Sequence, residues 1–467
     1  MFPDVDAEIM QRCAIFAGLV MFVTIPVWGQ VEDRVPPATS PFAVSDNSPV
    51  PEQDDSARMV TPAAVSGRAY PVALGSQERS NYLRGGITFM GAYTDNALGS
   101  ATGTPESDVS YSVLPFIALD QTTAREHLVL NYAPGYTFYQ RFSERNEADQ
   151  NASINFAYRL SPHVTFSASD GFQKSSSVFN QPDLAATGVV NPGPQAPNFS
   201  VIAPFADRLS NAGSVGLTYQ FALNDMLGGN GTFTNLHYPN PTEVPGLFDS
   251  SSEAGLAFYA HRVSSKNYFG ITYQYQRLLA YPTLGTAETQ THAPLVFYSI
   301  YPAKGFNLSL FGGPQYSETT QAAQPSLKQW TPAGGASLSW QGHLTSFALS
   351  YLHIISSSAG LISAVQLDSA TASLSQQITK SLIASVSGGY AQNDTLGTFS
   401  TSGVVFNGHS ISGTASLQQQ IGKSLAFQLA YTRLRQDYGG VPILALTPNT
   451  NRESVSVSYQ FGKALGR

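Results

Sequence analysis

Charged side chains are scarce in this sequence. Asp, Glu, Lys and Arg make up 12% of its 467 residues, about half the share of roughly 25% found in ordinary globular domains. Uncharged Ser, Thr, Gln, Asn, Gly and Tyr supply the rest of the polar surface. The net charge of −7 argues against a basic surface for nucleic acid, so no nucleic-acid partner is expected.

Cysteine is almost absent, and the single Cys13 lies in a segment that we expect to be removed. Without it the chain has no disulfide, zinc–cysteine site or thiol nucleophile. The eight histidines are dispersed without the spacing of a zinc site, and no Asp-rich calcium loop occurs. The Gly-rich stretch 227–231 lacks the Lys and the helix of a phosphate cradle. We therefore predict no metal and no cofactor.

One long apolar run lies near the N-terminus, over residues 14–28. It is shorter than the ~20 residues of a transmembrane helix and fits the apolar region of a secretory signal peptide cleaved before Gln30. The acidic residues before Met10 fit a basic leading segment poorly, and translation from Met10 would remove them. Residues 1–29 are predicted to be a signal peptide, and an uncleaved anchor helix is the alternative.

Residues 30–80 contain many prolines among acidic and small residues. Such a stretch cannot bury a core, so we predict a disordered, Pro-rich periplasmic lead. It is too short to form a plug domain in a wide barrel. The remaining residues, 81–467, are assigned to one outer-membrane β-barrel.

Apolar and polar residues alternate along most of the chain after Tyr82, and no convincing amphipathic helix appears. The same period of two recurs in 109–117, 269–276, 425–431 and 454–461. In the last of these, Val455 and Val457 share one face, and Ser456 lies on the other. The polar faces are almost uncharged, whereas an exposed face of a soluble sandwich would carry Lys and Glu. A transmembrane barrel explains this, because its apolar face meets lipid and its polar face meets a watery lumen.

Short and long connections alternate between these segments. Tight turns are predicted at 160–162, 223–225, 264–266, 302–304, 341–343, 379–381 and 422–424, and longer loops at 141–150, 175–208, 239–250, 281–287, 318–329, 356–366, 392–406 and 437–451. Outer-membrane barrels have short periplasmic turns and long outer loops. We predict an all-β fold, a single antiparallel transmembrane barrel of about 18 strands (16–18), with both termini periplasmic.

Four prolines fall inside predicted strands: Pro115, Pro134, Pro294 and Pro314. Each removes a hydrogen-bond donor from the strand ladder. We expect them to mark bulges or strand ends.

Three segments near the start of the predicted barrel resemble a known family. They are Gly91-Ala-Tyr-Thr-Asp-Asn-Ala97, Leu114-Pro-Phe116 and Leu130-Asn-Tyr-Ala-Pro-Gly-Tyr-Thr-Phe-Tyr139. Together they resemble the β-barrel porins found with exopolysaccharide-biosynthesis operons, over residues 85–175. The resemblance implies an outer-membrane barrel and a link to surface polysaccharide, and it supplies no catalytic residues.

Two histidines have neighbours that could suggest catalysis. His353 lies near Ser350 and Ser356, and His127 lies near Glu126 and Arg125. A hydrolase would need Ser, His and an acid brought together on neighbouring strands. The sequence is so rich in serine that such proximity is expected by chance. We therefore predict that the protein is not an enzyme and has no catalytic residue.

Aromatic residues are abundant, and many fall near predicted strand ends. Those noted are Tyr136, Phe138, Tyr275, Tyr281, Tyr298, Tyr301, Trp330, Trp340, Tyr431 and Tyr438. Interfacial girdles are the first interpretation, and an aromatic slide for sugars in the lumen is the second. Girdle residues point outward, whereas slide residues point inward.

The first functional hypothesis is a porin-like channel for small hydrophilic solutes, or a conduit associated with surface polysaccharide. Its partners would be outer-membrane lipid and the barrel assembly machinery. A lumen with few charges predicts weak ion selectivity, unless the acidic loop bearing Glu144, Glu147 and Asp149 folds into the pore. The alternative is a non-conducting structural or adhesive barrel that binds partners through outer loops such as 175–208. An outer-membrane enzyme is the third hypothesis.

Overall fold

The computed structural model describes residues 59, 80–97, 105–176, 207–240, 247–282, 285–303, 305–321, 325–357, 364–396, 407–439 and 449–465. The chain divides into two units, Met1–Pro37 and Ala38–Arg467, and the first lies entirely outside the described residues. The predicted signal peptide 1–29 and all of the predicted lead except Met59 and Ser80 therefore lie outside them too. The same holds for most of the predicted loops 175–208, 392–406 and 437–451.

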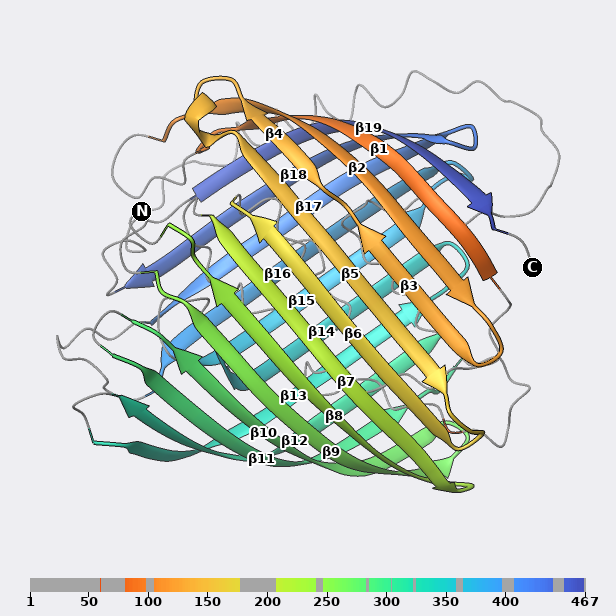
Figure 1. Ribbon diagram of the computed structural model, residues 1–467, viewed down its shortest axis with the longest axis vertical. Helices are drawn as coiled ribbons and strands as arrows, with labels where there is room; N and C mark the ends of the chain where they lie inside the picture. Colours follow the sequence, from red (N-terminus) through yellow and green to blue (C-terminus); the bar gives the residue numbers. More distant parts are fainter. Residues whose placement is uncertain are drawn as a thin grey trace, which may run out of the picture. The chain divides into compact units, whose positions relative to one another are not determined.

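Antiparallel strands form nearly all of the described chain (Figure 1). They are β1 Ser80–Thr94, β2 Asp108–Thr122, β3 Glu126–Tyr132, β4 Gly135–Tyr139, β5 Glu147–Arg159, β6 Val164–Ser175, β7 Arg208–Ala222, β8 Asp225–His237, β9 Ser250–Ser264, β10 Asn267–Ala280, β11 Ala287–Ile300, β12 Phe306–Gln321, β13 Leu327–Gln341, β14 Thr345–Ser356, β15 Val365–Gln377, β16 Leu382–Thr395, β17 Asn407–Ile421, β18 Leu425–Gly439 and β19 Asn449–Ala464. A 3-10 turn, η1, spans Ser143–Arg145 between β4 and β5. Among the described residues, no helix has the length and apolar character needed to cross a membrane.

The strands close into a barrel in sequence order, because β1 pairs with β19 as well as with β2. Both β3 and β4 lie between β2 and β5 and act as one interrupted strand, so the wall has 18 strands. Tyr82 lies opposite Ala464, which puts the start of β1 and the end of β19 at the same end of the barrel. The predicted all-β antiparallel barrel of about 18 strands is confirmed.

Proline explains the break between β3 and β4. The pairs Val113–Tyr136 and Ile117–Tyr132 bracket a gap in the ladder, and the shared register places Pro115 opposite Pro134 in that gap. Since neither residue has an N–H to donate, their opposition concentrates two missing donors at one point.

A second pair of prolines behaves in the same way. The pairs His292–Tyr316 and Val296–Gly312 bracket a gap between β11 and β12, and the register places Pro294 opposite Pro314. Here the strands continue through the gap. The expected strand end is found only at Pro134. The other three prolines lie inside continuous strands, where they leave gaps in one ladder without a bulge.

The two faces of the wall have opposite chemistry. On β19, Val455, Val457 and Tyr459 point outward and are 45–48% exposed. Ser456 and Ser458 point inward. The same alternation holds on β10, where Ile271 is outward and Thr272 is buried on the inner side. Apolar residues outside and polar residues inside are typical of a transmembrane barrel.

The two ends of the barrel differ in their connections. One end, here called the short-turn end, carries all seven predicted tight turns and the start of β1. The other, the long-loop end, carries the longer connections. The structure adds a turn at 123–125 and a long connection at 95–107, both missed from the sequence. The predicted loops 141–150 and 318–329 are too long, because β5 begins at Glu147 and β12 extends to Gln321. The predicted loops 392–406 and 437–451 are also too long, because β16 extends to Thr395 and β18 to Gly439.

Candidate functional site

Paired hydroxyl groups cover much of the inner face of the barrel, which is the candidate functional surface. Residues on neighbouring strands meet at the same level and bond to each other, as in Thr88–Ser458 (2.8 Å), Ser112–Thr137 (2.9 Å), Ser299–Ser309 (2.9 Å) and Ser385–Ser416 (2.7 Å). A hydroxyl both donates and accepts a hydrogen bond. These pairs therefore make a neutral, polar wall, as the sequence predicted for a lumen.

A charged cluster lies inside the barrel near its long-loop end. It consists of Glu147 and Asp149 on β5, Arg208 on β7 and Arg452 on β19, all at most 8% exposed. The Tyr139 hydroxyl donates to Glu147 Oε1 at 3.4 Å, and Arg452 interacts electrostatically with both carboxylates. The inner face near this end therefore carries side chains of both signs of charge.

The acidic loop considered in the sequence is thus divided between two environments. Glu144 lies in η1 and is exposed, whereas Glu147 and Asp149 belong to β5 and point inward. The sequence named Glu147 and Asp149 as residues that could enter the pore, but it did not predict the approach of Arg452 to them. No local pattern could reveal it, because Arg452 approaches Glu147 only when β19 closes the barrel against β1.

Large apolar side chains also face inward, and glycines accommodate three of them. Phe258 lies opposite Gly228, Phe297 opposite Gly270 and Phe311 opposite Gly335. A Cβ added to any of these glycines would lie 2.3–2.4 Å from the partner ring. Each ring therefore covers the bare backbone of the next strand, an arrangement used to stabilise glycine in sheets.

The candidate catalytic histidines are not assembled into a catalytic set. His353 Nδ1 contacts Asp368 Oδ1 at 2.7 Å, whereas the Ser350 hydroxyl bonds to Thr371 at 2.6 Å. His353 and Ser350 are three residues apart on one strand, so they point to opposite faces. Their closeness in sequence is therefore not closeness in space.

His127 has a different surrounding. Its Nε2 lies 4.0 Å from Asp120, while the neighbouring Glu126 backbone N–H donates to Thr123 Oγ1. The contact between His127 and Asp120 lies at the short-turn end. Within the described ranges no group of three or more His, Cys, Asp and Glu residues could hold a metal.

Most of the aromatic residues noted in the sequence point outward and form girdles. At the long-loop end, His292, Tyr316 and Trp330 follow one another, with ring centroids 6.3 Å and 5.3 Å apart. At the short-turn end, Phe221 lies 6.5 Å from Tyr259. The residues found outside are Tyr136, Phe138, Tyr275, Tyr281, Tyr298, Trp330, Trp340 and Tyr431.

Two of the noted aromatics point inward. The Tyr438 hydroxyl accepts a hydrogen bond from Asn393 at 2.7 Å, and Tyr301 packs edge-on against Tyr268 at 5.8 Å. They lie in different parts of the wall, on β18 and just after β11. They therefore do not form a continuous aromatic slide.

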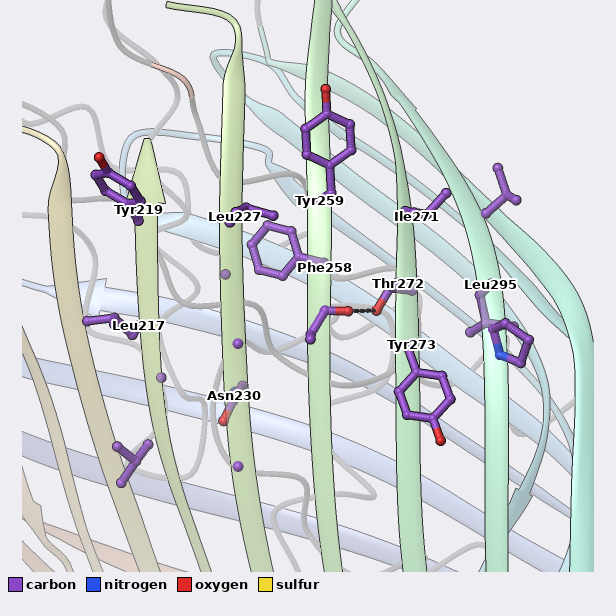
Figure 2. Close-up of a pocket in the computed structure, with 18 of the residues that line it drawn as sticks. Leu217, Tyr219, Leu227, Asn230, Phe258, Tyr259, Ile271, Thr272, Tyr273 and Leu295 are labelled. Carbon is purple, nitrogen blue, oxygen red and sulfur yellow. Dashed lines mark hydrogen bonds between the residues drawn. The ribbon is translucent and has the colours of Figure 1, made fainter. Parts of the chain in front are cut away.

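A groove of about 1070 Å³ lies on the outer wall over β7–β11 (Figure 2). Gly229 and Gly231 of β8 contribute no side chains to its lining, and its labelled flanks include Tyr219, Ile271 and Tyr273. The Gly-rich stretch 227–231 therefore belongs to β8 and shapes both faces of the wall. The groove opens away from the lumen and is no part of the passage.

No known family matches the chain, and no curated protein is recognisably similar in sequence. Similar solved structures include Pseudomonas aeruginosa OpdK with vanillate, at 8% identity over 82% of this chain and 99% of that chain, with a TM-score of 0.38. Pseudomonas aeruginosa OccK2 (OpdF) in complex with glucuronate matches at 10% identity over 83% and 100%, with a TM-score of 0.40. The FrpB iron transporter of Neisseria meningitidis (F5-1 variant) matches at 9% identity over 82% of this chain and 83% of that chain, with a TM-score of 0.38. With such low identities and TM-scores, these similarities do not identify a solute for this chain.

Proposed function

We propose that this chain is an outer-membrane channel for small hydrophilic solutes. The observation that carries the proposal is a closed 18-stranded wall whose inner face is lined by paired hydroxyls. Barrels of 16–18 strands are wide enough to leave an aqueous passage. A polar inner face is compatible with water, and a water-filled passage would admit solutes that carry hydrogen-bonding groups.

The outer face supports a location in the bacterial outer membrane. Apolar side chains cover it, and aromatic residues gather towards both ends, as at the two interfaces of a bilayer. The short-turn end would face the periplasm and the long-loop end the outside. Outer-membrane lipid and the barrel assembly machinery are then the expected partners.

The charged cluster supports weak ion selectivity. Glu147 and Asp149 attract cations, whereas Arg208 and Arg452 attract anions, and all four are buried inside the wall. A channel discriminates strongly when one sign of charge dominates its constriction. We therefore infer a passage that admits neutral solutes and both ions of a simple salt.

A link to surface polysaccharide is a narrower form of the same proposal. It depends on the resemblance of residues 85–175 to porins found with exopolysaccharide operons. Within its Tyr-rich segment, Tyr136 and Phe138 point outward, so they serve the girdle and not a sugar-binding surface. The resemblance therefore supports an association with polysaccharide export more than stacking of sugars on that segment.

Liposome swelling tests the channel directly. Purified barrel in liposomes should admit arabinose or glucose at a measurable rate and larger oligosaccharides progressively more slowly. Folding is checked by comparing the electrophoretic mobility of unheated and heated protein on a denaturing gel, because a folded barrel migrates differently from the unfolded chain. Folded barrel that admits none of these sugars would contradict the proposal and favour the non-conducting surface barrel.

A further inference from the structure

An apolar patch interrupts the polar inner wall between β8 and β13. Its largest members are Met226, Phe258, Tyr268, Phe297 and Phe311, each at most 8% exposed. Water in an open lumen would cover these side chains at a free-energy cost. The glycines opposite three of them let the rings pack against the backbone of the next strand. They do not explain why apolar side chains gather there.

Met59 belongs to the same cluster, although it precedes the first strand. Its side chain is 2% exposed and packs within the apolar patch. Its backbone N–H donates to Gln220 Oε1 on β7 at 3.3 Å. An unbranched, polarisable thioether fits irregular apolar surfaces and makes favourable contacts with aromatic rings.

The length of chain between Met59 and β1 allows this placement. About 20 residues separate Met59 from Ser80, and they can reach at most ~70 Å. The patch lies roughly half-way around the strand order from β1. Half the circumference is about nine strand spacings of ~4.8 Å, or ~45 Å along the wall. β1 starts at the short-turn end, where Gln220 also lies near the end of β7.

We propose that this apolar patch is an intramolecular docking surface and that Met59 of the N-terminal lead is the side chain it binds. The amide contact with Gln220 sets the position of the backbone, and the thioether fills the surface between the rings. The predicted disordered lead would then have one fixed point inside the barrel. The proposal does not depend on conduction, because docking is measured on the folded protein itself.

Thiol accessibility tests the docking. In a Cys13→Ser background, which removes the only native cysteine, Met59→Cys should react with a maleimide far more slowly than Ser265→Cys, in the exposed turn between β9 and β10. We expect a rate difference on the order of tenfold or more, since a buried group reacts only when it opens locally. Denaturant should abolish the difference. Equal rates in folded protein would overturn the proposal.

Cross-linking identifies the partner surface. In the same background, Met59→Cys combined with Gln220→Cys is incubated with a short bis-maleimide for several half-times of the slow Met59→Cys reaction measured above. The two thiols should then be joined within one chain, giving a shifted monomer on a denaturing gel. Each single variant, and Met59→Cys combined with the outward-facing Phe221→Cys, should give no such band. A cross-linked dimer would assign the patch to another copy's lead and contradict the proposal. A double variant that folds but stays without a cross-link would also contradict the docking proposal.

Discussion

Gly270 lies directly opposite Phe297 on the neighbouring strand, and a methyl group added to it would come within 2.4 Å of the Phe297 ring. The ring and the glycine therefore form one unit of the inner wall. Gly270 lacks a side chain because the ring of the next strand fills that space. The same relation between Phe258 and Gly228 shows that it is a repeated solution to packing a lumenal ring.

Gly270→Ala should therefore destabilise the barrel. The added methyl would meet both the Phe297 ring and the backbone carbonyl oxygen of Tyr259, and overpacking of this kind costs about 1–3 kcal/mol. Gly255→Ala is the matched control, because nothing lies within 4 Å of its added Cβ. Urea unfolding of both variants in lipid vesicles measures the effect. Equal stability of the two variants would show that the ring does not constrain the glycine.

The assignment of the two faces is tested on β18. Leu429 lies opposite Val455 on the outward face, and Gln428 lies opposite Ser456 on the inward face. Leu429→Arg should impair assembly, since a charge facing lipid near the midplane costs roughly 2–4 kcal/mol. Gln428→Arg should assemble normally, because its side chain reaches the lumen. Comparable loss of folded barrel in both variants would count against the assigned faces.

The orientation of the barrel can be tested with single serine-to-cysteine changes. Ser326, at the long-loop end, and Ser265, at the short-turn end, are both exposed. An impermeant maleimide too large to cross the barrel should label Ser326→Cys on intact cells and spare Ser265→Cys until the outer membrane is opened. Trypsin should likewise leave Lys380 and Lys423, in short turns, uncut on intact cells. The reverse pattern would invert the orientation.

The charge balance of the lumen predicts two opposite changes in ion preference. Arg452→Gln removes a base and leaves Glu147 and Asp149, so the channel should shift towards cations. The double variant Glu147→Gln with Asp149→Asn should shift it towards anions. Reversal potentials across a KCl gradient report both changes. Identical values for the two variants and the unchanged protein would place the cluster away from the ion path.

Local patterns in the sequence were enough to predict the barrel. The alternation around Val455 and Ser456 depends only on the period of a strand, and the tight turns lie between regions of such alternation. The opposition of Pro115 and Pro134 needed the register of the strands, which no single segment specifies. The sequence showed that both prolines fall inside predicted strands, but it did not show that they lie opposite each other.

The functional surface was harder to predict, because it depends on barrel closure. Arg452 and Glu147 come from distant parts of the chain and meet only after β19 pairs with β1. Phe258 could be seen in the sequence, yet its inward direction and its contact with Gly228 required the pairing of β8 with β9. Nothing in the sequence predicts that Met59 is buried, since a single methionine in a Pro-rich segment belongs to no periodic pattern.

Single-channel recording in planar lipid bilayers tests the central claim most directly. Folded barrel should give steady open currents in KCl, and a salt gradient should produce a reversal potential near zero, because the inner face carries both acidic and basic side chains. Absence of current from protein shown to be folded and inserted would contradict the account of a conducting channel.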